Sequence, residues 1–375
     1  MCGSGTVLAV ARAHGHLAFG IDCDPLAVLS SKVWTSAINA RTILDKADEV
    51  LRRARRRCRL TPSRHAYPST ADDETRKFID YWYDRNSRRE LFALSECVSR
   101  IRNETTRRTL WCAFSRMIVA KKNGVSLAMD LAHSRPHRVR SSAPVRPFDQ
   151  FVAAATYVVR NCLVRGRRGI GPKPEVRHGD NRRLPFNRET FDLVITSPPY
   201  LNAIDYLRCS KFSLVWMGHT IGELRTIRSN SVGAERGLDL EDLSDPVRKT
   251  VSCMGDVNLL QDRQRRVLAR YVLDMQSSVT EVARVLKDGG RAVYVVGNNQ
   301  LGDVFISNSN AVRAVATNAG MKLESEYVRE LPPNRRYLPP PSSSGVGKNL
   351  ESRMRKEVVL QFAKRDGGIS RRCNE

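Results

Sequence analysis

The stretch FDLVITSPPY at residues 191–200 decides how the fold is interpreted. Its first five residues form a short, mainly apolar run, which is typical of a β-strand when turn-forming residues follow. Pro198 and Pro199 then end this strand, because proline has no backbone N–H to donate and its φ is fixed. The Ser197 hydroxyl and the main-chain carbonyls are therefore acceptors at a rigid strand end, next in sequence to the flat ring of Tyr200.

This combination of side chains suits a flat base that carries an exocyclic amine. Such a base would stack on the ring of Tyr200, and its NH2 group would donate to the fixed oxygens of Ser197 and Pro198. The alternative is an ordinary strand that ends in a Pro-Pro turn.

A second candidate strand-end site opens the chain, where CGSGT at residues 2–6 is a glycine-rich loop. The strand-like residues 17–22 follow it and end on Asp22. In an open α/β sheet, a glycine loop lets a ligand approach the backbone closely, and an acid at the end of the next strand accepts hydrogen bonds from ribose hydroxyls. The pattern predicts a nucleoside-containing cofactor. The alternative role for Asp22 and Asp24 is to cap a helix that begins at Pro25.

The loop should follow a buried central strand, yet the chain as given begins on the loop itself. We therefore expect the core to lack its middle strand. A start codon placed too late, a truncated remnant, or a substitute that holds the loop would each explain this. An in-frame upstream strand ending in Asp-Pro would restore the core.

The charge balance favours a polyanionic partner. The chain has 63 lysines and arginines against 39 aspartates and glutamates, a net charge of +24 and a pI of about 10.2. Such an excess indicates nucleic acid as the partner. An arginine-rich proteome would give the same surplus without DNA binding.

The cysteines and the apolar runs indicate a cytoplasmic protein. The nine cysteines are scattered without a C-x-x-C pair, so neither a zinc site nor a disulfide framework is expected. No apolar run approaches the roughly 18 residues of a transmembrane helix. Arg12, His14 and His16 interrupt the N-terminal apolar stretch, which makes it a poor signal peptide. We expect no metal and no membrane partner.

The pattern of the chain predicts an α/β core with a helical insertion. Residues 1–40 hold the first part of the core, and residues 41–172 form a helical, arginine-rich insertion that is the candidate target-recognition region. The core resumes over residues 173–365, with a smaller excursion at about 221–260, and residues 366–375 form a basic tail.

Several elements of this core and insertion are specific enough to test. Helices are predicted over residues 75–101 and 264–286, the latter capped by glycines before the next strand. The strand-like residues 321–328 and 357–362 are joined by a loop without a helix, which predicts one antiparallel strand.

Four motifs in this order resemble those of S-adenosylmethionine-dependent DNA amino-methyltransferases. Residues 1–6 resemble motif I, residues 20–22 motif II, residues 179–180 motif III and residues 196–200 motif IV. A long insert between the cofactor loop and S-P-P-Y resembles the class whose target-recognition region lies there. The resemblance covers most of the chain outside the insert. The resemblance implies a Rossmann-like sheet with one antiparallel strand. The serine that this chain has in motif IV, Ser197, is commoner in cytosine-N4 than in adenine-N6 enzymes of this kind.

The resemblance also implies the roles of individual residues. The cofactor S-adenosyl-L-methionine would be bound by Cys2, Gly3, Gly5, Thr6, Asp22 and Asp180. Within that set the glycines would line its methionine end, Asp22 would hold the ribose, and Asp180 would accept from the adenine amine. The catalytic set would be Ser197, Pro198, Pro199 and Tyr200. Direct methyl transfer needs neither a covalent intermediate nor a metal.

Contacts to double-stranded DNA are assigned, as a hypothesis, to two arginine-rich segments. The residues are Arg135, His137, Arg138, Arg140, Arg335, Arg336 and Tyr337. These contacts would offset the cost of extruding the base from the duplex, which is on the order of a few kcal/mol. The alternative for each arginine is a solvated surface charge. A cognate restriction endonuclease would be a further partner in a restriction-modification system.

Three other functions stay open at this point. They are adenine-N6 methylation of DNA, guanine-N2 methylation of RNA, and a truncated, inactive DNA-binding remnant. An RNA enzyme usually carries an RNA-binding module upstream, and none is visible in this sequence.

Overall fold

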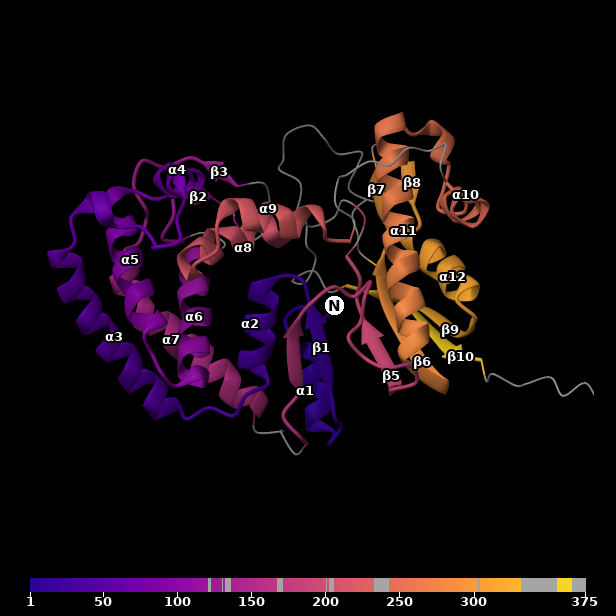
Figure 1. The fold of residues 1–375 in the computed structure, drawn as a ribbon, viewed down its shortest axis with the longest axis horizontal. Coiled ribbons are helices and arrows are strands. Elements are labelled where there is room, and N and C mark those ends of the chain that lie inside the picture. Colours follow the sequence, from indigo (N-terminus) through magenta and orange to yellow (C-terminus); the bar gives the residue numbers. More distant parts are fainter. Residues whose placement is uncertain are drawn as a thin grey trace, which may run out of the picture. The chain divides into compact units, whose positions relative to one another are not determined.

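The structure is a computed structural model, and its fold is of the mixed α/β class predicted from the sequence. It describes residues 1–120, 123–129, 131, 136–166, 171–199, 201, 206–232, 243–301, 304–331 and 356–365. The chain forms two compact units (Figure 1). The helical unit comprises residues 2–178 and 205–228. The sheet unit comprises residues 1, 179–204 and 229–375.

The helical unit contains a small two-stranded parallel sheet. Its strands are β1 (Phe19–Asp22) and β4 (Glu175–His178), which pair in register from Phe19 opposite Glu175 to Asp22 opposite His178. Helices α1 (Thr6–Ala13) and α2 (Pro25–Trp34) flank β1 in the sequence. Leu8, Ala18, Val28 and Val176 form a small core between these elements.

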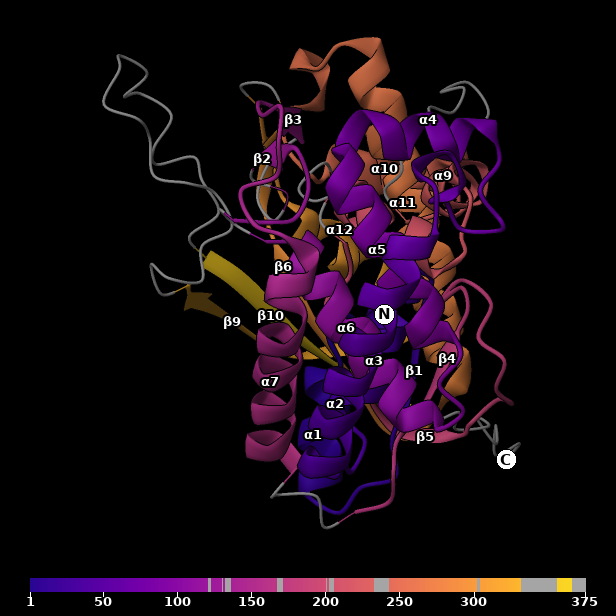
Figure 2. The ribbon, with the colours of Figure 1, turned by 90° about the vertical axis from the view of Figure 1, so that its left-hand side faces the viewer.

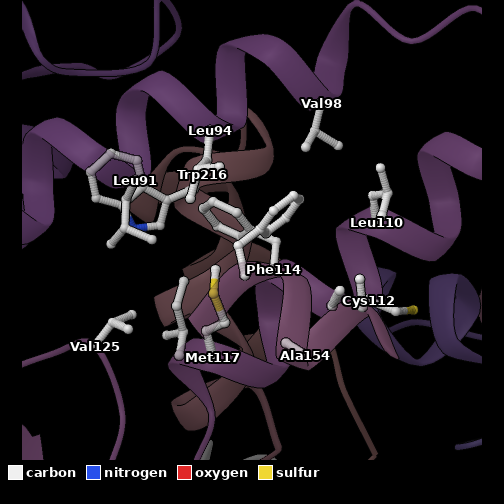
Figure 3. Close-up of a cluster of buried hydrophobic side chains, with 14 of the residues drawn as sticks. Leu91, Leu94, Val98, Leu110, Cys112, Phe114, Met117, Val125, Ala154 and Trp216 are labelled. Atoms are coloured by element: carbon white, nitrogen blue, oxygen red, sulfur yellow. The ribbon is translucent and has the colours of Figure 1, made fainter. Parts of the chain in front are cut away.

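The rest of the helical unit is a cluster of helices whose apolar faces form one large core (Figures 2 and 3). This core includes side chains that are at most 2% exposed, among them Leu91, Leu94, Phe114 and Trp216. The helices are α3 (Ala40–Leu60), α4 (Asp73–Trp82), α5 (Arg85–Ser99), α6 (Glu104–Ile118), α7 (Pro147–Gly166), α8 (Tyr206–Leu214) and α9 (Ile221–Ser229). Two short antiparallel strands, β2 (Ala128–Met129) and β3 (His137–Arg138), lie between α6 and α7 in the sequence.

The predicted helix over residues 75–101 is wrong in one respect, since two helices occupy that range. Helix α4 ends at Trp82, and Asp84 caps α5 by accepting from the N–H groups of Asn86 and Ser87, both at 2.9 Å. A side chain that accepts from the free N–H groups of a first turn fixes a helix start there. The aromatic residues of this region pack in the core, as expected from their helical spacing.

The sheet unit is built on a four-stranded mixed sheet. The strand order is β5-β6-β10-β9, with β5 parallel to β6 and β10 antiparallel to both of its neighbours. The strands are β5 (Phe191–Thr196), β6 (Leu286–Gly297), β9 (Met321–Glu330) and β10 (Lys356–Lys364). The single antiparallel strand predicted from the helix-free connection is therefore confirmed.

Helices and a hairpin complete the described part of the sheet unit. The helices are α10 (Asp245–Ser252), α11 (Asp262–Val285) and α12 (Asn308–Asn318), and the hairpin strands are β7 (Asn299–Leu301) and β8 (Val304–Ile306). Tyr271 of α11 and Tyr294 of β6 are almost completely buried in the core of this unit. Helix α11 is predicted correctly to within two residues, but β6 begins directly at Leu286, which already pairs with Phe191.

Within the described residues, no helix is long and apolar enough to cross a membrane. The same part of the chain contains no group of three or more acidic, histidine or cysteine side chains that could hold a metal ion.

Candidate active site

The glycine loop at residues 2–5 belongs to the helical unit and is held by several hydrogen bonds. The N–H of Gly5 donates to the Cys2 carbonyl at 2.9 Å, and the Ser31 hydroxyl donates to the Gly3 carbonyl at 2.9 Å. Gly3 has a φ of 50° and Gly5 a φ of 76°, in the left-handed region that favours glycine. The loop thus requires glycine at the two positions that the sequence singled out.

Asp22 and Asp24 have different roles at the end of β1. Asp24 caps α2, because its carboxylate accepts from the N–H of Leu26 at 2.8 Å, and it also accepts from the Ser210 hydroxyl at 2.9 Å. Asp22 accepts from the N–H of Gly3 at 2.8 Å and from the N–H of Asp24 at 3.1 Å. The helix-capping alternative therefore applies to Asp24, while Asp22 ties the loop to the strand.

Burial raises the pKa values of two side chains near the glycine loop, Asp24 and Cys2. Burial raises the pKa of the Asp24 carboxyl, and the hydrogen bonds from Leu26 and Ser210 oppose that effect only in part. Burial likewise raises the pKa of the Cys2 thiol, which keeps this side chain neutral beside the loop. The Cys2 thiol is therefore not suited to act as an anionic nucleophile.

The loop has room and acceptor capacity for a nucleoside cofactor. A carboxylate offers about four acceptor positions, and the two hydrogen bonds to Asp22 leave capacity for ribose hydroxyls. A side chain at Gly3 would meet no atom within 4 Å, so the surface beside this residue is open. Gly5, in contrast, lies against Ser31, where an added Cβ would come within 2.8 Å of the Cα atom.

The Ser-Pro-Pro sequence lies at the end of β5 in the sheet unit. Thr196 is the last residue of this strand and pairs with Tyr294 of β6. Ser197 is exposed and Pro198 is buried. Parallel strands end at the same edge of a sheet, so Ser197 lies at the carboxyl edge of β5 and β6. Tyr200 lies outside the described residues.

An asparagine network supports this carboxyl edge, and the sequence interpretation did not include it. The Asn299 amide donates to the Leu201 carbonyl at 2.6 Å, and the Asn308 amide donates both to the Gly297 carbonyl and to Asn299, each at 2.8 Å. Leu201 and Asn308 are fully buried. The network anchors the residue that directly follows Tyr200. The sequence GNN at residues 297–299, directly after an apolar run, is the pattern that could have indicated this network.

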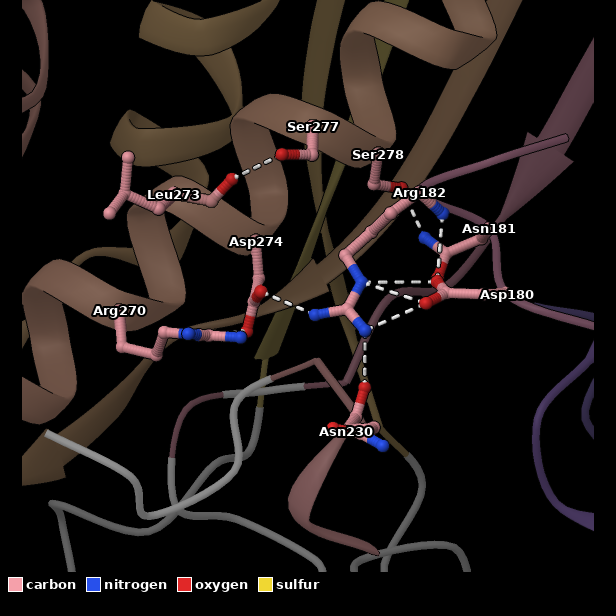
Figure 4. A network of polar contacts seen from close by, with 9 residues as sticks. All are labelled: Asp180, Asn181, Arg182, Asn230, Arg270, Leu273, Asp274, Ser277 and Ser278. Atoms are coloured by element: carbon pink, nitrogen blue, oxygen red, sulfur yellow. Dashed lines mark hydrogen bonds and ion pairs between the residues drawn. The ribbon is translucent and has the colours of Figure 1, made fainter. Parts of the chain in front are cut away.

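Asp180 is held by a neighbouring arginine in the sheet unit (Figure 4). Its two carboxylate oxygens accept from Arg182 through the backbone N–H and the guanidinium, over distances of 2.7 to 3.1 Å. The same guanidinium donates to Asp274 of α11 at 2.6 Å and to the main-chain carbonyl of Asn230. Arg270 forms a second ion pair with Asp274, at 3.2 Å.

This network shifts the pKa values of its charged members. Burial raises the pKa of Asp180, but the hydrogen bonds from Arg182 outweigh burial, so the net pKa is lowered. The hydrogen bond to Asp180 in turn raises the pKa of Arg182. Both groups are therefore charged at neutral pH, and nothing in the sequence indicated their link to Asp274.

The structure describes only some of the residues assigned to DNA contact. His137 and Arg138 are exposed on β3, and the Arg138 guanidinium lies over the ring of Tyr81 at 4.9 Å from its centre. Arg140 is half-buried. The remaining assigned residues, Arg135, Arg335, Arg336 and Tyr337, lie outside the described residues.

Comparison with known proteins gives one curated relative along nearly the whole chain. The type II methyltransferase M.MvaI of Kocuria varians is 23% identical over 385 residues, which cover 96% of this chain and 82% of that protein. The chain is similar to a type II methyltransferase. Because the match covers 96% of the chain, it includes residues of both units. No family model matches the sequence.

Solved structures match more loosely. The protein TTHA0409 from Thermus thermophilus, in complex with S-adenosyl-L-methionine, is 15% identical with a TM-score of 0.25, over 50% of this chain and 54% of that chain. A SAM-dependent methyltransferase from Methanosarcina mazei is 12% identical with a TM-score of 0.26, over 56% of this chain and 79% of that chain. The chain thus spans about half the length of the first of these two proteins.

Proposed function

We propose that this protein transfers a methyl group from S-adenosyl-L-methionine to an exocyclic base amine of duplex DNA, with cytosine N4 as the preferred target. The observation that carries the proposal is the position of Ser197 and Pro198 at the carboxyl end of β5, in a chain similar to a type II methyltransferase along 96% of its length.

The glycine loop and Asp22 support binding of the cofactor. Gly3 leaves open surface at the loop, and Asp22 retains acceptor capacity for the ribose hydroxyls. The N-terminus of α1 has no side-chain cap, so its free N–H groups suit the cofactor's carboxylate. When bound, the cofactor supplies an electrophilic methyl group on a sulfonium.

The Ser-Pro-Pro edge supports activation of the amine. The lone pair of an aromatic amine is delocalised into the ring, which makes the nitrogen a poor nucleophile. The two N–H groups of the amine donate hydrogen bonds to the Ser197 hydroxyl and the Pro198 carbonyl. These hydrogen bonds favour a pyramidal nitrogen with a localised lone pair. Tyr200 stacks on the extruded base and holds it in this orientation.

The choice of cytosine N4 rests on the serine of the motif. Adenine-N6 methylation is the alternative within the same chemistry, because both bases present an NH2 group to the same acceptors. Guanine-N2 methylation of RNA and an inactive DNA-binding remnant are the alternatives outside it. The similarity to a type II methyltransferase favours DNA over RNA as the substrate.

A labelled-cofactor assay tests this function. We expect incubation with duplex DNA to give labelled N4-methylcytosine after nucleoside digestion, and incubation with tRNA to give none. Tyr200→Ala should reduce methyl transfer by at least tenfold while cofactor affinity, measured by calorimetry, changes less than twofold. Labelled N6-methyladenine would move the target to adenine, and equal loss of transfer and cofactor binding would show that the motif is misassigned.

A second prediction concerns the arginines on and beside β3. Replacing both Arg138 and Arg140 with glutamine should weaken duplex binding and make it less dependent on salt. Each lost phosphate contact lowers the slope of log affinity against log salt by about 0.9. Fluorescence anisotropy over a salt series measures this slope. An unchanged slope would contradict the assignment of these residues to DNA contact.

A further inference from the structure

Helix α3 carries a basic pocket that the preceding assignments do not use. Arg55, Cys58 and Arg59 of α3 line it, together with Arg89 of α5 and Phe148 of α7, and its volume is about 350 Å³. All five residues belong to the helical unit. The pocket is open to solvent, so a ligand can enter it from one side.

The lining carries three positive charges and no acidic side chain. Arg55 and Arg59 are exposed and have no ion pair within the described part of the chain. The nearby acid, Glu90, is buried and paired with Arg146. A guanidinium stays protonated at any physiological pH, so the positive charge of the pocket is permanent.

Arg89 has an unused donor in this region. One of its terminal nitrogens donates to the Cys58 carbonyl at 2.7 Å and to the Thr61 carbonyl at 3.3 Å, at the end of α3. Its Nε is buried and has no hydrogen-bond partner among the described residues. Because this Nε has almost no accessible surface, the donors that the pocket offers to a ligand are the exposed guanidinium groups of Arg55 and Arg59.

The other arginines of α3 show that the pocket is not an average basic surface. Arg53 pairs with Glu49 at 2.9 Å, and Arg57 pairs with Glu96 at 2.9 Å. The chain therefore neutralises these two arginines and leaves Arg55 and Arg59 without an acid among the residues described. Positions 55 and 59 are one turn apart, so both side chains lie on one face of the helix.

We propose that this pocket binds a backbone phosphate of duplex DNA, a contact that rests on DNA being the substrate. A phosphate offers several acceptor oxygens to guanidinium groups, and Arg55 and Arg59 present two such groups on one face of α3. Arg52 and Arg56 are also exposed on the same helix. They extend the positive charge beyond the pocket, which suits a polymer of phosphates better than a single free phosphate.

The test compares two double variants that lose the same charge from the same helix. Arg55→Gln with Arg59→Gln removes the pocket charges, and Arg41→Gln with Arg53→Gln removes two paired arginines outside the pocket. Fluorescence anisotropy with labelled duplex DNA is measured from about 50 to 300 mM salt, where phosphate contacts dominate the salt dependence. We expect the pocket variant to bind at least fivefold more weakly at the lowest salt, with a slope lower by about 0.9, and the control to change less than twofold.

Several results would overturn the proposal. Equal losses in the two variants would indicate a general charge effect. Thermal protection of the wild type by inorganic phosphate, with unchanged DNA affinity in the pocket variant, would indicate a free phosphate. Loss of affinity for duplex RNA alone would indicate an RNA contact. Circular dichroism of both variants confirms that they are folded.

This binding assay also separates the pocket from the proposed enzyme activity. Methyl transfer by the wild type with no effect of the pocket variant on the salt slope would reject the pocket alone. A lower slope in the pocket variant, with no methyl transfer by the wild type to any base, would reject the enzyme and retain the DNA contact.

Discussion

Gly5→Ala is expected to lower the affinity for S-adenosyl-L-methionine by more than tenfold. Gly5 has a φ of 76°, and an L side chain in this region costs about 1 to 2 kcal/mol. The new Cβ would also come within 2.8 Å of the Ser31 Cα and 2.9 Å of its Oγ. Ser31 holds the Gly3 carbonyl, so its displacement would move the part of the loop that would face the cofactor in the proposed site.

Gly15→Ala is the matched control for this variant. Gly15 has a φ of 82°, but a Cβ there would meet no atom within 4 Å. This variant carries the backbone strain without the clash against Ser31. Calorimetric titration with the cofactor should show near wild-type affinity for Gly15→Ala. Comparable losses in both variants would mean that strain alone, rather than the loop's contact with α2, controls binding.

Arg182→Met is expected to lower the free energy of unfolding by about 3 kcal/mol, the usual scale for removing one partner of a buried ion pair. Methionine keeps most of the side-chain volume but removes the charge. Asp274, whose side chain is 5% exposed, would retain only its ion pair with Arg270. Asp180 would lose the guanidinium that binds both of its oxygens.

The effect of Arg182→Met should depend on pH in a defined direction. Arg182 lowers the pKa of Asp180 in the folded protein, so the pair stabilises the fold above the usual aspartate pKa of about 3.9. This stabilisation is lost as the pH falls through the lowered pKa. Urea unfolding should therefore show the largest difference between wild type and variant near neutral pH, and a smaller one below about pH 4.

A partly exposed arginine on α11, the helix that carries Asp274, gives the control for Arg182→Met. Arg265 pairs with Asp262 at the surface of α11, and exposed pairs contribute about 0 to 1 kcal/mol. Arg265→Met should leave the free energy of unfolding within about 0.5 kcal/mol of wild type. If both variants behaved alike at all pH values, the network around Asp274 would have no special role.

The sequence predicted the elements whose signals are local. The apolar run that ends in Pro198 indicated β5, and the helix-free connection between residues 328 and 357 indicated the antiparallel strand β10. In each case the decisive information lies within a few residues of the element.

Features that depend on distant partners were not accessible from the sequence. The pairing of Asp180 with Arg182 is local, but its link to Asp274 joins residues 92 positions apart. The break between α4 and α5 depends on whether Asp84 acts as a cap or lies within a continuous helix, and helical periodicity alone does not distinguish these. The role of Asn308 depends on the fold of β6 and α12 together.

The way Arg182 binds Asp180 has a consequence for how the protein would recognise an adenine ring. Three N–H donors of Arg182, the backbone N–H, Nε and Nη2, contact the Asp180 carboxylate, which offers about four acceptor positions. One position therefore remains for an incoming amine, on a carboxylate whose side chain is 42% exposed. If the adenine amine uses this position, nucleoside analogues that lack the amine should compete with the cofactor less well than those that retain it.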